Sequence, residues 1–224
     1  MNMVSRHSFR PIFSRLFPVR MAVLPLLAIC LLFSGCFGLG KKSPMIERYT
    51  LEYPSPTFEN LTRLDQTIKV ERFSVAKAFN TESMVFRPDA FKLDTYASHR
   101  WMVNPGDMTS DYLLRDLRNS GLFRAVFSYR DYDDARFVLE GGLEEFMEVD
   151  EGKGRSAVLT LTVNLLDLSR TGTPSRLIFQ KKYRSVEPIP DADPAGLARA
   201  MSTGAGKVSA QVIKDVYGAV LNLY

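Results

Sequence analysis

Few residues of this chain could take part in chemistry, and a cysteine near the N-terminus is the most informative of them. Cys36 is preceded by the small residues Ser34 and Gly35, and these follow an apolar run over residues 21–33. The thiol of such a cysteine can act as a nucleophile or accept an acyl chain. Four arginines, at positions 6, 10, 15 and 20, precede the apolar run, and no acidic residue accompanies them. A basic segment, an apolar segment and small residues in this order are typical of a secretory signal peptide.

The apolar run is too short to cross a membrane. Its 13 residues would span about 20 Å as a helix, whereas the hydrocarbon core of a bilayer is about 30 Å thick. We therefore expect residues 1–35 to be a signal peptide that is removed.

The residues Leu32-Phe33-Ser34-Gly35-Cys36 resemble the bacterial lipobox, in which a cysteine after small residues is diacylated and becomes the new N-terminus. Phe33 departs from the motif, which prefers Leu at this position. The alternative is an ordinary signal peptide with a stray apolar cysteine, as Cys30 is. The lipobox predicts Cys36 as the lipidation site and residues 36–44 as a short tether. Two acyl chains would hold the protein firmly at a membrane surface.

The mature chain is electrically balanced. Removal of 35 of the 224 residues leaves 189, and the 29 basic side chains of the precursor fall to 25, which equals the number of acidic ones. The basic isoelectric point therefore belongs to the signal, and the charge gives no reason to expect nucleic-acid binding. This length suits one domain, which we place at residues 45–224. The single remaining cysteine excludes an internal disulfide and a cysteine-type metal site.

The sequence contains no recognisable arrangement of catalytic residues. The mature chain has one histidine, His99, and lacks the G-x-S-x-G elbow of a serine hydrolase, the paired histidines of a zinc peptidase and a phosphate-binding loop. The acidic residues 131–134 could bind calcium weakly, but a solvated turn is favoured because their spacing is not that of an EF-hand. The acidic stretch 144–151 favours the solvent face of a strand over a glycosidase pair. We therefore expect no enzyme activity, no cofactor and no metal site.

One short motif is a candidate for binding a partner protein. His99-Arg100-Trp101 contains the only tryptophan of the chain, beside an arginine and just before a predicted helix. Trp and Arg are enriched at the energetic centres of protein interfaces, so Arg100 and Trp101 are candidate partner-binding residues. The alternative is that Trp101 fills the junction of sheet and helix while Arg100 reaches a nearby carboxylate.

The rest of the sequence predicts an α+β fold. One helix is expected to begin after Asn104-Pro105-Gly106 and to end at Gly121, and a second, behind the N-cap Asp193, to run from Pro194 to Leu223. Alternation and turn residues favour a mostly antiparallel sheet with these two principal helices packed on it. Strands are indicated over residues 46–53, 67–73, 83–87, 90–96, 122–129, 136–149, 157–168 and 176–186.

The sequences of the strands 136–149 and 157–168 predict local features of the sheet. Gly141 and Gly142 indicate a bulge or a close backbone approach in the strand 136–149. In the strand 157–168, four apolar residues at alternate positions predict an inward face, namely Leu159, Leu161, Val163 and Leu165.

This order of elements resembles the ABC-type transport auxiliary lipoproteins, the paraquat-inducible protein C-like family. The matching features are the lipobox at Cys36, the Tyr49-Thr50-Leu51 strand, the Ile68-x-Val70 strand, the His99-Arg100-Trp101 element, the paired long strands and the closing amphipathic helix. The resemblance covers residues 45–223, and it is weakest over residues 74–98, which lack obvious landmarks.

The resemblance implies a non-enzymatic periplasmic component of an envelope phospholipid transport system. Its partners would be an ABC permease and ATPase and a mammalian-cell-entry domain protein, and acyl chains would hold it to the membrane. Because Phe37 follows the cysteine, where Asp would be the inner-membrane retention signal, the outer membrane of a Gram-negative host is favoured. Two alternatives are a lipoprotein that scaffolds or activates a cell-wall or outer-membrane assembly machine, and a carrier that holds lipid in its own cavity.

Overall fold

The computed structural model describes residues 45–150, 152, 154–172, 176–191 and 193–223. The predicted signal peptide, Cys36 and the tether lie outside these residues. The described elements are β1 (Glu47–Tyr49), β2 (Leu64–Val70), β3 (Ser74–Val75), the 3₁₀ helix η2 (Lys77–Phe79), β4 (Ser83–Asp89), β5 (Lys92–Trp101), α2 (Pro105–Ser120), β6 (Phe123–Ser128), β7 (Phe137–Asp150), β8 (Arg155–Asp167), β9 (Leu177–Ile189) and α4 (Pro194–Leu221).

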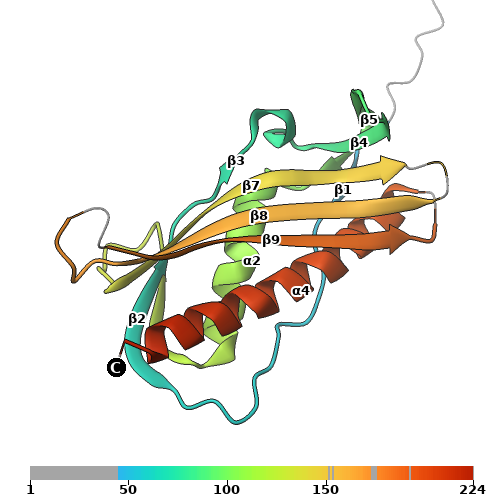
Figure 1. Ribbon diagram of the computed structural model, residues 1–224. Helices are drawn as coiled ribbons and strands as arrows, with labels where there is room; N and C mark the ends of the chain where they lie inside the picture. The colour runs from blue at the N-terminus through green and yellow to red at the C-terminus, as the bar shows by residue number, and fades with distance from the viewer. Residues whose placement is uncertain (1–44, 151, 153, 173–175, 192, 224) are drawn as a thin grey trace, which may run out of the picture. The chain divides into compact units, whose positions relative to one another are not determined.

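The centre of the fold is an antiparallel meander of three long strands, β7, β8 and β9 (Figure 1). The predicted inward face of β8 is confirmed, because Leu159, Leu161, Val163 and Leu165 are all buried. Apolar residues at alternate positions predicted this face because helices cover one side of these strands and the other side faces outward.

The other edge of β7 pairs with three short strands in turn, and all of them run parallel to it. Ile68 of β2 lies opposite Phe137, Ser74 of β3 opposite Gly142, and Phe86 of β4 opposite Glu148. In the described part of the chain five of the eight strand pairings are parallel, so the prediction of a mostly antiparallel sheet is wrong. The sheet is mixed and curled, with a largely parallel core around β2, β4 and β7.

Both predicted helices are present: α2 begins at Pro105, two residues before the predicted start, and ends at the predicted glycine, while α4 begins at the predicted Pro194 and ends at Leu221, two residues before the predicted end. Asn104 accepts a hydrogen bond from the Gly106 amide at 3.0 Å at the start of α2, and Gly121, at φ +65°, ends it in the left-handed conformation. Asp193 caps α4 in the same way, with Pro194 at its first turn. Local residues decide such ends, which is why the two predicted helices are confirmed.

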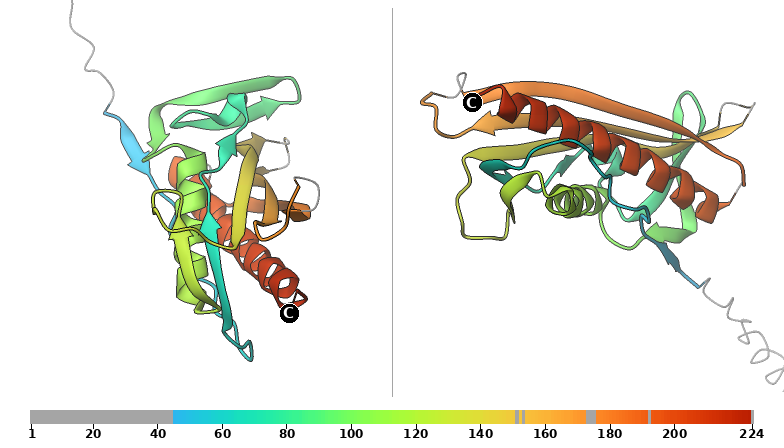
Figure 2. Two further views of the ribbon diagram at one scale, coloured as in Figure 1. Left: turned by 90° about the vertical axis from the view of Figure 1, so that its left-hand side faces the viewer. Right: turned by 90° about the horizontal axis from the view of Figure 1, so that it is seen from below.

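The two helices cover the sheet and cross each other at a steep angle, since the right-hand view of Figure 2 shows α4 lengthwise and α2 end-on. α4 crosses β8 and β9, and α2 lies against β6 and β7. Leu113 of α2, Leu161 of β8 and Val212 of α4 line one small apolar space with Leu51 and Tyr53. The core is therefore closed by the extended segment that follows β1 as well as by the helices.

That segment corrects the predicted first strand. Only Glu47–Tyr49 pairs as a strand, and residues 50–53 leave the sheet to run across the helices. Tyr112 donates a hydrogen bond to the carbonyl of Leu51, and the amide of Glu52 donates to Ser202 Oγ at 2.9 Å. Helix side chains thus take over the backbone partners that a neighbouring strand would supply.

Candidate functional site at the junction of β1 and β5

The His99-Arg100-Trp101 motif lies at the end of β5, where β1 pairs with it in parallel. Glu47 lies opposite His99, Arg48 opposite Arg100 and Tyr49 opposite Trp101. The motif therefore belongs to a strand and precedes α2 by a short turn, since the helix begins at Pro105. Because successive strand residues point to opposite faces, Arg100 and Trp101 face different surroundings.

Trp101 points into the core. Its side chain is 1% exposed and meets the ring of Phe146 edge-on, with 5.0 Å between the ring centroids. Its backbone amide donates to the carbonyl of Glu82 at 2.7 Å. The indole thus holds the end of β5 against β7, and a contact of Trp101 with a partner stays a prediction.

Arg100 is half-buried on the other face of the strand. Its Nε is buried, and no atom of the described residues accepts a hydrogen bond from it. Within the ranges that the structure describes, no carboxylate lies within ion-pair distance of this guanidinium. Its neighbour across the strands, Arg48, does have a partner, with Nη1 3.3 Å from Glu82 Oε2. Within the described chain, the buried Nε of Arg100 thus lacks the acceptor that buried donors in folded proteins usually have.

Polar contacts fasten β1 to β5 beside this arginine. Tyr49 donates to Glu47 Oε2 at 2.6 Å, and Nδ1 of His99 lies 3.5 Å from both of these side-chain oxygens. The hydrogen bond with Glu47, together with burial, raises the pKa of Tyr49 to about 12. The tyrosine therefore stays a neutral donor, and the first described strand is fixed to the domain.

A buried polar cluster around Asp116 was not expected from the sequence. Asp116 of α2 is fully buried and accepts hydrogen bonds from Tyr53 at 3.0 Å, Ser55 at 2.8 Å and Ser209 at 2.6 Å. Arg115 lies 2.8 Å from the same carboxylate. Burial and the neighbouring Asp116 carboxylate raise the pKa of the Tyr53 hydroxyl well above its usual range.

These contacts join three parts of the chain, namely residues 53–55, α2 and α4. The carboxylate has partners on both oxygens, so the cluster acts as a clamp within the fold. The sequence does contain an indication of this buried cluster, because Asp116 lies between Leu113 and Leu117 on the apolar face of the predicted helix.

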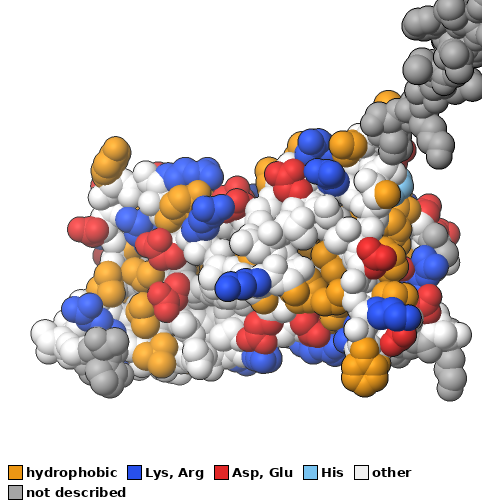
Figure 3. Space-filling model, turned by 90° about the horizontal axis from the view of Figure 1, so that it is seen from above, with side chains coloured by type: hydrophobic (Ala, Val, Ile, Leu, Met, Phe, Trp, Pro, Cys, Tyr) orange, Lys and Arg blue, Asp and Glu red, His pale blue; other side chains and the backbone are white. Residues whose placement is uncertain are grey.

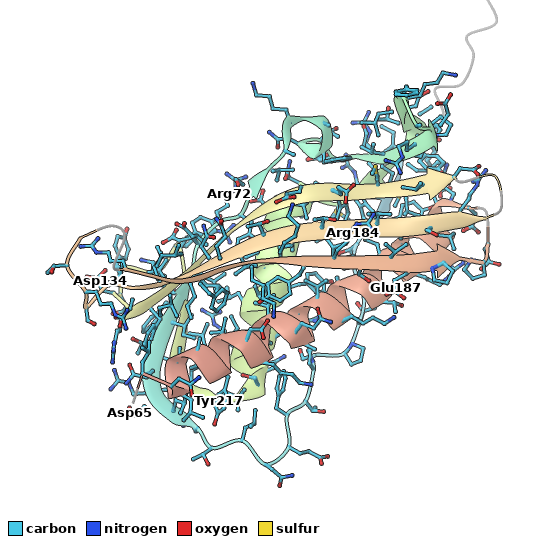
Figure 4. All side chains as sticks on the ribbon, in the orientation of Figure 1. Asp65, Arg72, Asp134, Arg184, Glu187 and Tyr217 are labelled. Atoms are coloured by element: carbon cyan, nitrogen blue, oxygen red, sulfur yellow. The ribbon has the colours of Figure 1, made fainter. Side chains whose placement is uncertain are left out.

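Glu144 and Glu145 of the acidic stretch lie on the outer face of the sheet, as predicted. Glu144 contacts Thr162 and Lys182, while Glu145 contacts Thr160 and Arg184 (Figure 4). Charges of both signs are interspersed over this face (Figure 3). They pair with neighbouring strands, as cross-strand neighbours in a sheet do.

Glu148 is the exception in the acidic stretch. It is buried, accepts a hydrogen bond from Tyr96 at 2.8 Å and lies 3.2 Å from Arg155. Here the predicted solvent face is wrong, because the register of β7 with β8 places Glu148 opposite the buried Ala157 and two residues beyond the buried Phe146, on the side of β7 that faces the core.

Among the described residues, no group of three or more His, Cys, Asp or Glu side chains is arranged to hold a metal ion. In the same part of the chain, no helix combines the length and apolarity that a membrane crossing needs.

Solved structures share this fold. The crystal structure of protein XCC0632 from Xanthomonas campestris, described as a DUF330 protein, superposes with a TM-score of 0.71 at 18% identity, over 79% of this chain and 98% of that one. The hypothetical protein CT253 from Chlamydia trachomatis gives a TM-score of 0.51 at 11% identity, over 70% of this chain and 98% of the other. At such identities the likeness concerns the fold alone.

The sequence itself matches a family. No curated protein gives a significant match. Residues 49–213, however, match the family model of the ABC-type transport auxiliary lipoprotein component, from the last residue of β1 into α4. The match covers more than half of the chain and includes α2, the complete β7–β9 meander and most of α4. This chain therefore belongs to the family of ABC-type transport auxiliary lipoprotein components.

Proposed function

We propose that this protein is a membrane-anchored periplasmic lipoprotein of a phospholipid transport system, and that it acts without catalysis by binding other components. Those components are an ABC permease and ATPase and a mammalian-cell-entry domain protein. The family match over residues 49–213 is the observation that carries the proposal.

Arg100 is the residue we propose for the contact with the transport partner. The support is its half-buried guanidinium, whose Nε has no hydrogen-bond acceptor among the described residues. A carboxylate of the partner would accept a hydrogen bond from this Nε. Charge-assisted hydrogen bonds to arginine are among the stronger hydrogen bonds in proteins. Trp101, from the opposite face of β5, would hold the strand in place for this contact.

The partner contact is tested by co-purification from native envelopes. Arg100→Ala should lower recovery of the mammalian-cell-entry protein, because an interface arginine at an energetic centre contributes about 2 kcal/mol or more, a roughly thirtyfold change in affinity. Arg100→Lys should rescue binding only partly, since an ammonium lacks the planar fork of the guanidinium.

Arg48→Ala is the matched control, since it removes a neighbouring cation that already pairs with Glu82. Equal loss in both variants would indicate a general charge effect. Full recovery with Arg100→Ala would contradict the assigned contact. Capture of a cell-wall synthase without any permease would replace the transport function by the scaffold function.

We propose Cys36 as the lipidated residue that anchors the domain, with the outer membrane as its destination because Phe37 follows it. Cys36→Ser should leave an uncleaved, mislocalised precursor, since only the thiol can form the thioether and start processing. Incorporation of labelled palmitate into wild type and variant measures this. Equal labelling would contradict the lipobox, and sucrose-gradient fractionation separates the two membranes.

A further inference from the structure

β1 is held to the rest of the fold along one edge. It is a three-residue strand at the end of the sheet, and among the described residues β5 is its only strand partner (Figure 2). Glu47 and Arg48 are exposed and Tyr49 is half-buried, so burial of apolar surface contributes less here than in the core strands. Hydrogen bonds and ion pairs therefore decide how firmly β1 is held.

Side-chain contacts link β1 to its neighbours on both faces of the strand. Arg48 pairs with Glu82, just ahead of β4, at 3.3 Å. On the opposite face, Nδ1 of His99 lies 3.5 Å from the Tyr49 hydroxyl oxygen and 3.5 Å from Glu47 Oε2. Arginine and glutamate keep their charges near neutral pH, whereas an imidazole changes its charge between about pH 5 and 8. His99 is therefore the part of this attachment that responds to pH.

The hydrogen positions in this group show what His99 must supply. Tyr49 directs its single hydroxyl hydrogen to Glu47 Oε2, at 2.6 Å. The carboxylate is an acceptor and the hydroxyl oxygen has only lone pairs left, so Nδ1 of His99 faces two acceptors. Nδ1 can hydrogen-bond to them only as a donor. Protonation of the ring fixes a hydrogen on Nδ1 and places a positive charge beside Glu47.

Three carboxylates act on the surroundings of His99. Glu148 of β7 accepts a hydrogen bond from Tyr96, whose ring meets the imidazole edge-on with 5.9 Å between the ring centroids. Asp193, at the start of α4, is close enough for its negative charge to act on the same tyrosine. Glu47 of β1 is the third and lies nearest to the imidazole.

Glu47 differs from the other two carboxylates in its partners. Arg155 lies 3.2 Å from Glu148, and an arginine of α4 lies 3.8 Å from Asp193. In the part of the chain that the structure describes, Glu47 has no Lys or Arg within ion-pair distance, and the basic side chain beside it is His99. A proton taken up by His99 therefore completes an ion pair that exists only while β1 lies on β5.

We propose that His99, with Glu47 and Tyr49, is a pH-sensitive latch that fastens β1 to β5. Protonation favours the state in which the imidazolium has a partner, so the latch holds β1 more firmly below about pH 6 and less firmly above about pH 7. Release of residues 45–49 would lengthen the chain ahead of the domain by at most about 17 Å. That consequence rests on the anchor of the proposed function, whereas the latch itself does not.

Two neighbouring amides report separately on β1 and on its surroundings. The Met102 amide donates to the carbonyl of Tyr49 at 2.7 Å, so it exchanges with solvent when β1 leaves β5. The Trp101 amide donates to the carbonyl of Glu82 at 2.7 Å, a bond that does not involve β1. The pair is therefore an internal comparison within one protein.

The test is amide hydrogen exchange of the full-length protein in detergent, followed by NMR. Exchange is expressed as protection relative to an unstructured peptide at the same pH, which removes the pH dependence of the chemical step. The protection of Met102 should be higher at about pH 5.5 than at about pH 7.5, by up to about fivefold, since exposed ion pairs contribute little. The protection of Trp101 should not change.

Three variants identify the groups responsible. His99→Gln keeps a hydrogen-bond donor but takes up no proton in this range, so the protection of Met102 should become independent of pH. Glu47→Gln should have the same effect with His99 in place. Glu82→Gln is the matched control, because it removes the other ion pair of β1, with Arg48. It should lower the protection of Met102 equally at both pH values.

The outcomes decide for or against the latch. Equal protection of Met102 at the two pH values in the wild-type protein overturns it. A pH dependence that survives His99→Gln or Glu47→Gln also overturns it, since another group then titrates. An equal response of Trp101 would show a change in the whole sheet and would contradict a latch confined to β1.

Discussion

Arg100 and Trp101 are neighbours in sequence with opposite environments. The strand turns one towards the surface and the other into the core, where the indole meets Phe146. A short motif can therefore combine the proposed contact residue, Arg100, with the residue that positions it. The two contributions are separable by experiment, because the contact proposed for Arg100 concerns binding and the buried indole concerns the stability of the fold.

Trp101→Ala should lower the free energy of unfolding by about 3–5 kcal/mol, because it removes a large buried aromatic side chain and leaves a cavity. Chemical denaturation followed by far-ultraviolet circular dichroism measures the change. Met102→Ala is the control, since this adjacent side chain is largely exposed and its loss should change stability by no more than about 0.5 kcal/mol. An unchanged denaturation midpoint for Trp101→Ala would contradict the core role.

At the scale of elements, β7 organises the sheet from both of its edges. One edge holds β8 over the whole length of the strand, and the other receives β2, β3 and β4 in succession. Between β2 and β3 the ring of Phe73 packs on Gly141, where a bulge or a close backbone approach was predicted, and the register shift of β7 lies between Leu143 and Glu145. A Cβ at this position would lie 2.9 Å from the ring of Phe73, which is itself buried.

Gly141→Ala should therefore destabilise the protein by about 1–3 kcal/mol, since the added methyl group displaces a packed ring. Gly218→Ala in α4 is the matched control, because a Cβ there meets no atom within 4 Å. It should stabilise the protein by about 0.5–1 kcal/mol through helix propensity. Urea denaturation of both variants measures whether each substitution raises or lowers the free energy of unfolding. A stabilising Gly141→Ala would contradict the close approach.

At the scale of the whole molecule, stability should depend on pH through a pair that closes the β7–β8 ladder. Arg136 donates to both carboxylate oxygens of Asp167, at 3.1 and 3.0 Å. These hydrogen bonds, with those from Ser169 and against the opposing effect of burial, lower the pKa of Asp167 to about 2. An unfolded aspartate titrates near 3.9, so the unfolded chain binds more protons between these values. The stabilisation is complete above about pH 4 and is lost as the pH falls towards 2.

Asp167→Asn should cost about 1.5–3 kcal/mol at pH 7, the usual contribution of hydrogen bonds to a charged group. The difference from wild type should shrink as the pH falls from 4 towards 2. Thermal unfolding across this range measures it, with Asp65→Asn as control, since the exposed pair of Asp65 and Arg124 contributes no more than about 1 kcal/mol. A difference that stays constant with pH would contradict the lowered pKa.

The sequence alone determined the parts of this protein that depend on neighbouring residues. The end of α2 follows from Gly121 and the start of α4 from Asp193, and the inward face of β8 follows from its apolar residues at alternate positions. The order of elements was also enough to indicate the family that the comparison confirms. These features are local because a cap or a strand face is set within a few residues along the chain.

Only the tertiary structure decided which strands pair and in which direction. An alternating strand carries the same pattern beside a parallel or an antiparallel partner, so the pairing of β2, β3 and β4 with β7 could not be predicted. Burial of Glu148 and the missing counter-ion of Arg100 likewise depend on segments distant in sequence. The candidate site follows from this pairing, because the free energy of a buried charge is set by what surrounds it in space and not by its neighbours in the chain.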